Sequence, residues 1–173
     1  MPAALQLDRF TTERLVAERI VPEHEDELLK LHQDPEVARS LGGKRTRPEV
    51  QVMIERYLRH WEAHGYGIWC LRDRGTAAFV GRAGLARVEI EGVTETEVIF
   101  ALMPGYWGQG LASELVATVV ERARPDLGLD DAVGYTPTGN IAAQRVLGKN
   151  GFAVERDIFH CGLPQILFRR AFV

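Results

Sequence analysis

The spacing of hydrophobic residues changes along the chain, and each change of pattern predicts a different element. Residues 12–20 alternate between apolar and polar side chains well enough for a strand, and a short helix through Leu31 is expected after it. Residues 50–61 then repeat apolar side chains at helical spacing, with Thr46 placed as an N-cap and Gly65 just past the end. This is the clearest helix of the sequence, and it should cover one face of the fold.

Strand-like segments dominate the middle of the chain. Short pairs of turn residues, Arg74-Gly75 and Glu91-Gly92, separate three of them. Three consecutive strands joined by tight turns predict an antiparallel meander. The three segments cover residues 66–73, 76–90 and 94–103.

The last part of the chain alternates helices and strands. Residues 108–123 carry leucines and valines at helical spacing, and Pro125 is expected to end that helix. A strand over residues 131–135 and a helix over residues 140–150 follow, and residues 152–173 return to strand-like composition. Because no repeat, linker or low-complexity segment marks a boundary, residues 1–173 are expected to form a single domain.

Composition narrows the class of protein. Charged residues make up 26% and hydrophobic ones 46% of the 173 residues, which is ordinary for a soluble globular chain. A net charge of −3 provides no excess of positive charge for a phosphate backbone, so nucleic acid is not expected as a partner. No stretch approaches the roughly 18 uninterrupted apolar residues of a membrane span, so no membrane association and a cytoplasmic location are expected.

Cysteine and histidine form no metal-binding pattern in the sequence. Cys70 and Cys161 lie in apolar stretches rather than in CxxC spacing, and both are interpreted as small core residues. His60 and His64 stand four positions apart on the predicted long helix and could share a metal, but no third ligand completes a site. A solvated helix face is the favoured interpretation, and no metal is expected.

A glycine-rich loop, residues 104–114, lies between a predicted buried strand and a predicted amphipathic helix. Glycines let backbone N–H groups approach an anion closely, and a helix start carries roughly +0.5 of an elementary charge. A pyrophosphate could therefore bind here without basic side chains, although a tight turn would explain the glycines equally well. The loop matches neither the GxGxxG fingerprint nor the lysine-containing P-loop, which disfavours nicotinamide cofactors and ATP.

This loop resembles motif A of the GNAT N-acetyltransferase superfamily, in which a Q/R-x-x-G-x-G/A segment binds the pyrophosphate of coenzyme A. The segment Trp107-Gly108-Gln109-Gly110-Leu111-Ala112 aligns with the motif, except that Trp107 departs from its first position. The form YWGxGxAxE resembles instead the ribosomal-protein N-acetyltransferase branch of the superfamily. Three further segments resemble that branch in the same order, Thr12–Leu15, Val80–Leu85 and Asn140–Phe152.

The resemblance implies an α/β fold of the GNAT type. Its mixed, mostly antiparallel sheet would have about seven strands, flanked by about four helices, and would splay open between the fourth and fifth strands. Acetyl-coenzyme A (acetyl-CoA), the acyl donor, would lie in that gap. The meander would supply the second to fourth strands, and residues 131–135 would form the fifth.

The resemblance also implies the residues that surround the acyl donor. Free backbone groups of residues 100–102 would grip the pantetheine arm. Asn140 would contact the same arm, although capping of the last helix is an equal alternative. Leu147 stands where many relatives carry a tyrosine that acts as proton donor. The implied donor-binding residues are Phe100, Ala101, Leu102, Trp107, Gly108, Gln109, Gly110, Leu111, Ala112, Ser113, Asn140 and Ala143.

Acetyl transfer needs a neutral amine, so a base must accept a proton from the ammonium form of the acceptor. Glu97 is the candidate base, because it begins a strongly apolar strand where the resemblance places a carboxylate facing the substrate. Glu95 and Glu97 share one side of that strand, so a solvent-facing edge charge is the alternative. Tyr106 is the candidate proton donor, and Ser113 is interpreted as a capping or phosphate contact rather than a nucleophile.

The main hypothesis is therefore an N-acetyltransferase that moves acetyl directly onto a primary amine. The acceptor could be a protein N-terminus, a polyamine or amino acid, or an antibiotic amine. The alternative is a non-catalytic module that senses acyl-CoA, which the replaced side chains at Ala143 and Leu147 favour. Arg45 and Arg47 could meet an acidic substrate or the adenosine phosphate, and the strands from Phe159 onward could join a homodimer.

Overall fold

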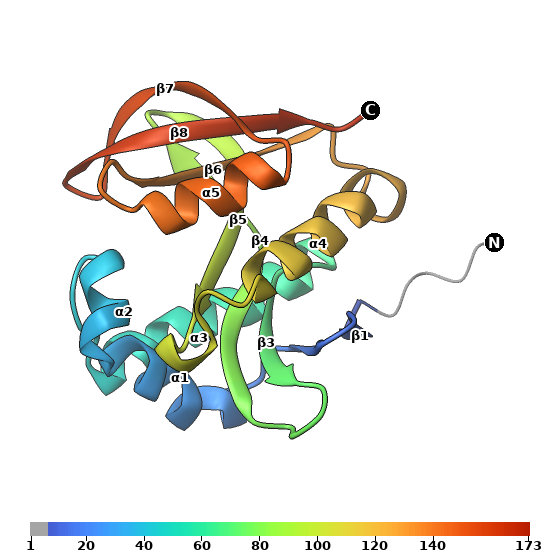
Figure 1. The fold of residues 1–173 in the computed structure, drawn as a ribbon, viewed down its shortest axis with the longest axis vertical. Coiled ribbons are helices and arrows are strands. Elements are labelled where there is room, and N and C mark those ends of the chain that lie inside the picture. Colours follow the sequence, from blue (N-terminus) through green and yellow to red (C-terminus); the bar gives the residue numbers. More distant parts are fainter. Residues whose placement is uncertain (1–6) are drawn as a thin grey trace.

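A single mixed β-sheet runs through the molecule, and the computed structural model describes residues 7–173 of the chain (Figure 1). The strands lie in the order β1-β2-β3-β4-β5-β6-β8-β7, and only β5 and β6 run parallel to each other. They are β1 (Arg9–Thr11), β2 (Leu15–Arg19), β3 (Ile68–Asp73), β4 (Phe79–Ile90), β5 (Val93–Leu102), β6 (Asp131–Pro137), β7 (Ala153–His160) and β8 (Leu163–Ala171).

The mixed sheet and the central meander of β3, β4 and β5 are confirmed. The sheet has eight strands rather than about seven, because the short β1 pairs with β2. The first predicted strand begins late, at Leu15, since Thr12 forms a turn in which its N–H donates to the Leu15 carbonyl at 2.9 Å. Residues 131–135 consequently form the sixth strand rather than the fifth.

Five α-helices flank the sheet in the described part of the chain, one more than expected. The additional helix is α2, which begins where the Asp34 carboxylate accepts the N–H groups of Glu36 and Val37. None of the helices of residues 7–173 is long and apolar enough to cross a membrane. The helices are α1 (Glu25–Gln33), α2 (Pro35–Ser40), α3 (Arg47–His64), α4 (Leu111–Leu127) and α5 (Ile141–Lys149), with 3-10 turns η1 (Pro22–His24) and η2 (Pro104–Tyr106).

The ends of the two long helices follow local chemistry. Thr46 and Glu49 form a reciprocal capping box at the start of α3, and Gly65 ends it at a φ of 72°, as predicted. The prediction that Pro125 ends α4 is wrong, since the helix continues to Leu127. Proline has a helical φ and costs one hydrogen bond in the last turn, so the helix ends only at Gly128, whose φ is 67°.

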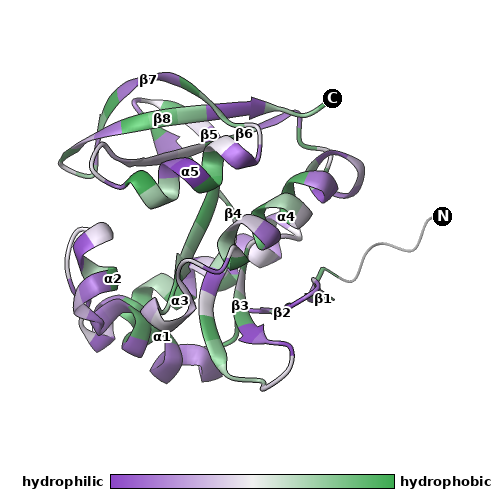
Figure 2. Cartoon of the chain, viewed as in Figure 1, coloured by the Kyte–Doolittle hydropathy of each residue, from purple (hydrophilic) through white to green (hydrophobic). Residues whose placement is uncertain are grey.

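Helices cover both faces of the central strands. Arg82 of β4 lies opposite Ala101 of β5, and Ala101 packs with Leu31 of α1 and Val37 of α2 on one face. The neighbouring residue Leu102 points to the other face, where α4 packs against β4 and β5. Figure 2 shows β5 as a largely apolar strand between these layers.

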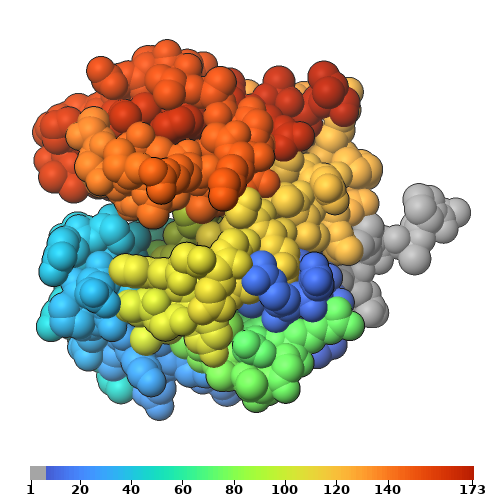
Figure 3. All heavy atoms as spheres, in the orientation of Figure 1, coloured from blue at the N-terminus to red at the C-terminus, as the bar shows by residue number. Residues whose placement is uncertain are grey.

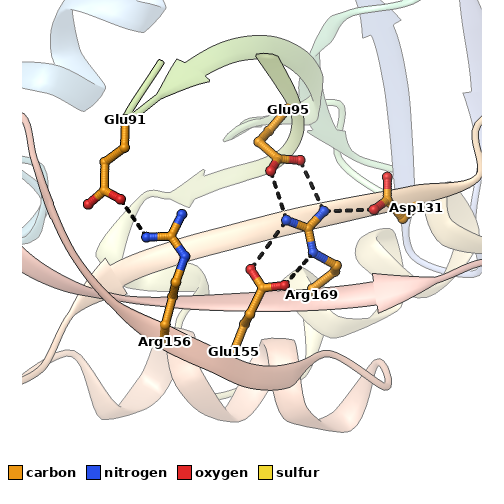
Figure 4. Close-up of polar contacts among 6 residues, drawn as sticks. All are labelled: Glu91, Glu95, Asp131, Glu155, Arg156 and Arg169. Carbon is orange, nitrogen blue, oxygen red and sulfur yellow. Dashed lines mark hydrogen bonds and ion pairs between the residues drawn. The ribbon is translucent and has the colours of Figure 1, made fainter. Parts of the chain in front are cut away.

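The β7–β8 hairpin extends the sheet beyond β6 and is tied to the turn between β4 and β5 by an ion pair of Arg156 with Glu91 at 2.5 Å (Figure 4).

Cys161 lies in the turn of this hairpin and is exposed, so the prediction of a core residue is wrong there, whereas Cys70 is buried as predicted. The apolar neighbours of Cys161 were misleading because Phe159 and Leu163 are themselves exposed.

The sheet splays open between β5 and β6, as expected for the GNAT type of fold. One register pair, Glu97 with Val133, joins the two strands, and beyond it β5 and β6 diverge (Figure 1). Because parallel neighbours normally exchange hydrogen bonds along their whole length, most of the facing edge of β5 is left without a strand partner.

One arginine joins the strands at the end of the sheet where β5 and β6 still pair. The guanidinium of Arg169, on β8, contacts Glu95 of β5 at 2.7 Å, Asp131 of β6 at 2.7 Å and Glu155 of β7 at 2.8 Å (Figure 4). These partly buried contacts join four strands at the end where β5 and β6 are together. The gap is therefore closed at one end and open at the other.

Two glycines of the segment Val80–Leu85 allow β4 to lie close to both neighbouring strands. A Cβ atom at Gly81 would collide with the carbonyl oxygen of Ala101, and one at Gly84 would collide with the carbonyl oxygen of Gly67. Both obstacles are backbone atoms, which cannot move aside as a flexible side chain could. This part of the family resemblance therefore reflects the packing of the sheet.

We expect Gly81→Ala to lower the free energy of unfolding by about 1–3 kcal/mol, because the strands must separate to admit a methyl group. Gly148→Ala is the matched control, since no atom lies within 4 Å of a Cβ at that helical position. That change should be neutral or stabilising by about 0.5–1 kcal/mol. Urea titration of both variants measures the difference, and equal stabilities would contradict the packing argument.

Candidate active site

The loop that follows β5 presents backbone N–H groups at the start of α4. Gly108 and Gly110 adopt φ values of 73° and 78°, which side-chain-bearing residues rarely adopt. Gly110 is the N-cap of α4 and provides no side-chain hydrogen bond to the first turn. The first N–H groups of a helix have no partner within it, so this end of α4 is an electropositive site suited to a pyrophosphate.

The loop is held in place by the segment Thr12–Leu15 from the start of the chain. The carboxylate of Glu114, in the first turn of α4, accepts hydrogen bonds from the Thr12 hydroxyl and from the N–H and Nε of Arg14. Arg14 also donates through Nη1 to the carbonyl of Gln109 at 2.8 Å. Burial tends to raise the pKa of Glu114, but these hydrogen bonds outweigh it and the pKa is lowered, which keeps the carboxylate charged.

Two side chains of the loop that were predicted to bind acetyl-CoA form hydrogen bonds within the protein instead. The indole N–H of Trp107 donates to the Leu102 carbonyl at 2.8 Å, while 47% of the residue stays exposed. The Gln109 amide donates to the Gly105 carbonyl at 3.1 Å. These contacts hold the loop in place. The backbone N–H groups at the start of α4, rather than these two side chains, are then the groups suited to bind a ligand.

Helix α5 packs beside the loop and the start of α4. The Asn140 side chain accepts the N–H of Ala143 at 3.1 Å, so the predicted capping role is present. The amide of Asn150 donates to the Ser113 hydroxyl at 3.2 Å and to the Val146 carbonyl at 2.8 Å. The end of α5 is thereby tied to the first turn of α4.

The open edge of β5 offers part of the backbone groups expected for a pantetheine arm, but the groups of Ala101 and the carbonyl of Leu102 are not free as predicted. Met103 donates its N–H to the Val80 carbonyl, and alternation along an antiparallel ladder then directs the groups of Ala101 toward β4 and those of Phe100 and Leu102 toward the gap. The Leu102 carbonyl is already bonded to Trp107, so it is not free as predicted. The N–H and C=O of Phe100 and the N–H of Leu102 remain on the open side.

Glu97 lies on β5 where the two strands part, on the face shared with Ile99 and Ala101. Its side chain is half-buried and has no ion-pair partner within residues 7–173. Burial raises its pKa to about 7, against the opposing effects of a hydrogen bond with Tyr135 and the positive charge of Arg82. The alternative of a solvent-facing edge charge is wrong for Glu95, which is paired with Arg169 and has only 12% of its side chain exposed.

Sequence reasoning missed Tyr135 of β6, which lies two residues beyond the point where β6 pairs with Glu97. Burial and the nearby Glu97 carboxylate raise the pKa of its hydroxyl, which therefore stays protonated at neutral pH. Only knowledge of the β5–β6 register would have placed Tyr135 beside Glu97. The predicted proton donor Tyr106 is half-buried in η2, and its hydroxyl makes no hydrogen bond to the described residues.

A groove gives access to this region from one side of the molecule. Figure 3 shows it between the surface formed by α1, α2 and η2 and the surface formed by β6, α5 and β8, with atoms of the β4–β5 region at its floor. Ala86, Glu97 and Ile99 share one face of β4 and β5 and keep partial exposure, although they lie on central strands.

One group of potential metal ligands lies close together in the described residues, but its members are engaged in contacts within the protein. His24, Glu27 and Cys70 bring one potential ligand atom each within 4.8 Å of one another. However, Glu27 binds Arg72 through both oxygens, and burial raises the pKa of the Cys70 thiol to about 12. The prediction of a solvated face for the histidines of α3 is wrong for His60, which contacts the Tyr66 carbonyl through Nδ1 and accepts the Arg87 N–H through Nε2.

Comparison with known proteins identifies the family. Residues 14–153 match the family described as "Acetyltransferase (GNAT) domain", so the chain belongs to the GNAT acetyltransferases. It is accordingly an acetyl-CoA-dependent acyltransferase. The loop, the open edge of β5 and the space around the glycines fit coenzyme A, since no atom lies within 4 Å of a Cβ at Gly108 and only the end of Arg14 lies near one at Gly110.

Individual relatives differ in how much of their length corresponds. The chain is 29% identical to the FsC-acetyl coenzyme A-N(2)-transacetylase of Aspergillus fumigatus over 86% of its own length and 66% of that protein. It is 25% identical to the uncharacterised N-acetyltransferase YoaA of Bacillus subtilis over 83% of its length and 82% of that protein.

Solved structures share the fold at low sequence identity. A GnaT-family acetyltransferase from Bordetella pertussis superposes with a TM-score of 0.84 at 21% identity, over 94% of this chain and 99% of that one. A ribosomal-protein-S5-alanine acetyltransferase from Vibrio fischeri gives 0.77 at 14% identity, over 95% and 96%. At these identities the likeness establishes the fold alone.

We expect Gly110→Val to weaken acetyl-CoA binding by about tenfold or more, because the substitution disturbs the left-handed backbone that aims the N–H groups. Gly128→Val is a matched control at the other end of α4, with a φ of 67° and open space around it. Both changes should carry a similar strain of about 1–3 kcal/mol. Calorimetric titration should find normal affinity in the control, and an equal loss in both variants would argue against the loop as the binding site.

Proposed function

We propose that the protein transfers acetyl from acetyl-CoA to a primary amine by direct attack within a ternary complex, with Glu97 as the general base. The observation that carries this proposal is a half-buried, unpaired carboxylate at the junction where β5 and β6 part. The acyl donor would lie along the open edge of β5, and the acceptor would approach from the groove. Residues 108–113, together with Asn140 and Ala143, would contact the donor.

The pKa of Glu97 suits this role. A general base is most effective when its pKa lies near the working pH, and burial raises that of Glu97 to about 7. An α-amine with a pKa near 8 costs about 1.4 kcal/mol to deprotonate at pH 7, whereas a lysine amine near 10.4 costs about 4–5 kcal/mol. A base of this strength favours an α-amine as acceptor.

The proton donor to the departing thiolate is a tyrosine in this proposal. Leu147 is an apolar, buried residue packed near Gly134 and has no proton to give. Burial and the Glu97 carboxylate raise the pKa of Tyr135, which makes its hydroxyl a poor proton donor, so its role in this proposal is to set the pKa of Glu97. Tyr106, in η2 directly before the donor loop, is the candidate donor.

The names of similar proteins support an α-amine acceptor. One relative is called an N(2)-transacetylase, and one structural neighbour is called an alanine acetyltransferase of a ribosomal protein. Membership of an acetyltransferase family argues against the alternative of a sensor that binds acyl-CoA without turnover. Binding of acetyl-CoA without thiol release from any amine would contradict the proposed function.

We expect Glu97→Gln to lower turnover at neutral pH by about 100-fold or more, with acetyl-CoA affinity unchanged. In the wild type, kcat/KM should rise with pH through about 7, because the base works only when deprotonated and burial raises its pKa to that value. The variant should lose this limb. The exposed carboxylate of Glu89 provides the control Glu89→Gln, and unchanged turnover in Glu97→Gln would remove Glu97 from the mechanism.

We expect Tyr135→Phe to move the acidic limb of the pH profile to higher pH. The hydrogen bond from Tyr135 lowers the pKa of Glu97, so its loss should raise that pKa. Tyr106→Phe should leave the limb in place, whether or not it lowers the plateau. Identical limbs in wild type and Tyr135→Phe would show that the two side chains are not coupled.

A further inference from the structure

A buried cationic cluster lies on the groove side of the sheet, near the end of α1. Arg82 of β4 is only 5% exposed and donates through Nε to Nε2 of His32, which is fully buried on α1. Arg45 joins the cluster by donating its backbone N–H to the His32 carbonyl at 3.2 Å. Three enclosed nitrogens have no hydrogen-bond partner among residues 7–173, namely Nη1 of Arg82, Nδ1 of His32 and Nε of Arg45.

Every unpartnered group of this cluster is a donor. Burial and the two arginines lower the pKa of His32 to about 3, so the imidazole is neutral. Its Nε2 accepts from Arg82, which leaves the proton on Nδ1. Neither Arg82 nor Arg45 forms an ion pair with a carboxylate of the described chain. Arg82 acts on Glu97 and Arg45 acts on Glu49 only at a distance. Because no carboxylate contacts either guanidinium and buried charges are costly without a paired group, the cluster has the character of an anion site.

The cluster and Glu97 lie at the two ends of the same face of β4 and β5, which forms the floor of the groove. Arg82 is opposite Ala101, and Glu97 is four residues earlier on β5, which places the two Cα positions about 13 Å apart along the strand. Between them on this face lie Gly84 of β4, which has no side chain, and Ile99 of β5, which is partly exposed. The Nη2 atom of Arg82 is neither bonded nor enclosed, so it is the part of the guanidinium that a ligand can reach.

We infer that Arg82 and Arg45 bind an anionic group of the acceptor, so that the enzyme prefers amines carrying a carboxylate several bonds from the nitrogen. This inference rests on the proposed acetyltransferase function and specifies its substrate class. With its amine at Glu97, such an acceptor would extend along the floor and place its carboxylate at the guanidinium. Polyamines and aminoglycosides would bring further positive charge to the arginines and are disfavoured.

A wild-type acceptor panel tests the preference without any mutation. Thiol release from acetyl-CoA is measured with triglycine, its C-terminal amide and its C-terminal aminoethylamide, which share an α-amine and differ in the distal group. We expect kcat/KM for the carboxylate to exceed that for the other two by about tenfold or more, as charge-assisted hydrogen bonds are the strong ones. Equal values would overturn the inference, whereas no thiol release from any amine would instead contradict the proposed function.

Variants then assign the preference to the cluster. Arg82→Gln should reduce the ratio of carboxylate to amide toward one when both are measured at a pH above the limb of Glu97, because loss of the Arg82 charge also raises the pKa of that carboxyl. Arg45→Gln should reduce the ratio in part. Arg39→Gln, at an exposed arginine of α2, is the control and should keep the ratio. An aminoalkyl phosphate in place of the carboxylate distinguishes the two kinds of anion.

Two outcomes would overturn the assignment. If Arg82→Gln shifts the pH limb of Glu97 but keeps the carboxylate preference, Arg82 acts only as a charge partner of Glu97. If Arg82→Gln does not fold, as judged by melting and acetyl-CoA binding, Arg45→Gln decides, because that residue is half-exposed. An unchanged ratio in Arg45→Gln would then exclude the cluster as the anion site.

Discussion

The parting of β5 from β6 is the constraint on which the rest of the molecule depends. Two parallel strands joined at a single register pair would normally form hydrogen bonds along their whole length, because a buried backbone group without a partner costs free energy. Arg169 joins four strands at the end where β5 and β6 pair, and no further register pair joins these two strands in the described chain. The result is a gap with Glu97 at its apex.

The donor side and the acceptor side of this gap are built from different materials. On the proposed donor side the contacts would come from backbone groups of the glycine loop and β5, which need few particular side chains. On the proposed acceptor side the features are the side chains of a carboxylate, a tyrosine and a buried arginine. Backbone contacts suit a donor that never changes, whereas side chains can differ between enzymes that modify different acceptors.

Local features of the fold were predictable because their causes are local. The capping residues of α3, the turns of the meander and the glycine loop all depend on residues close in sequence, and each was recovered. Tyr135 was missed because its position follows from a single long-range pairing. Cys161 was misassigned because apolar neighbours do not distinguish a core strand from an exposed hairpin. The end of α4 was misplaced because a proline in the last turn costs too little to stop a helix.

The contacts of Glu114 with Thr12 and Arg14 join positions 102 and 100 residues apart in the chain. A replacement of the carboxylate would leave the Arg14 side chain without its partner and release the Gln109 carbonyl that the same arginine holds. The three positions should therefore vary together in the history of such proteins, with substitutions at one end compensated at the other. A short N-terminal signature and a distant helix start would then be inherited as one unit.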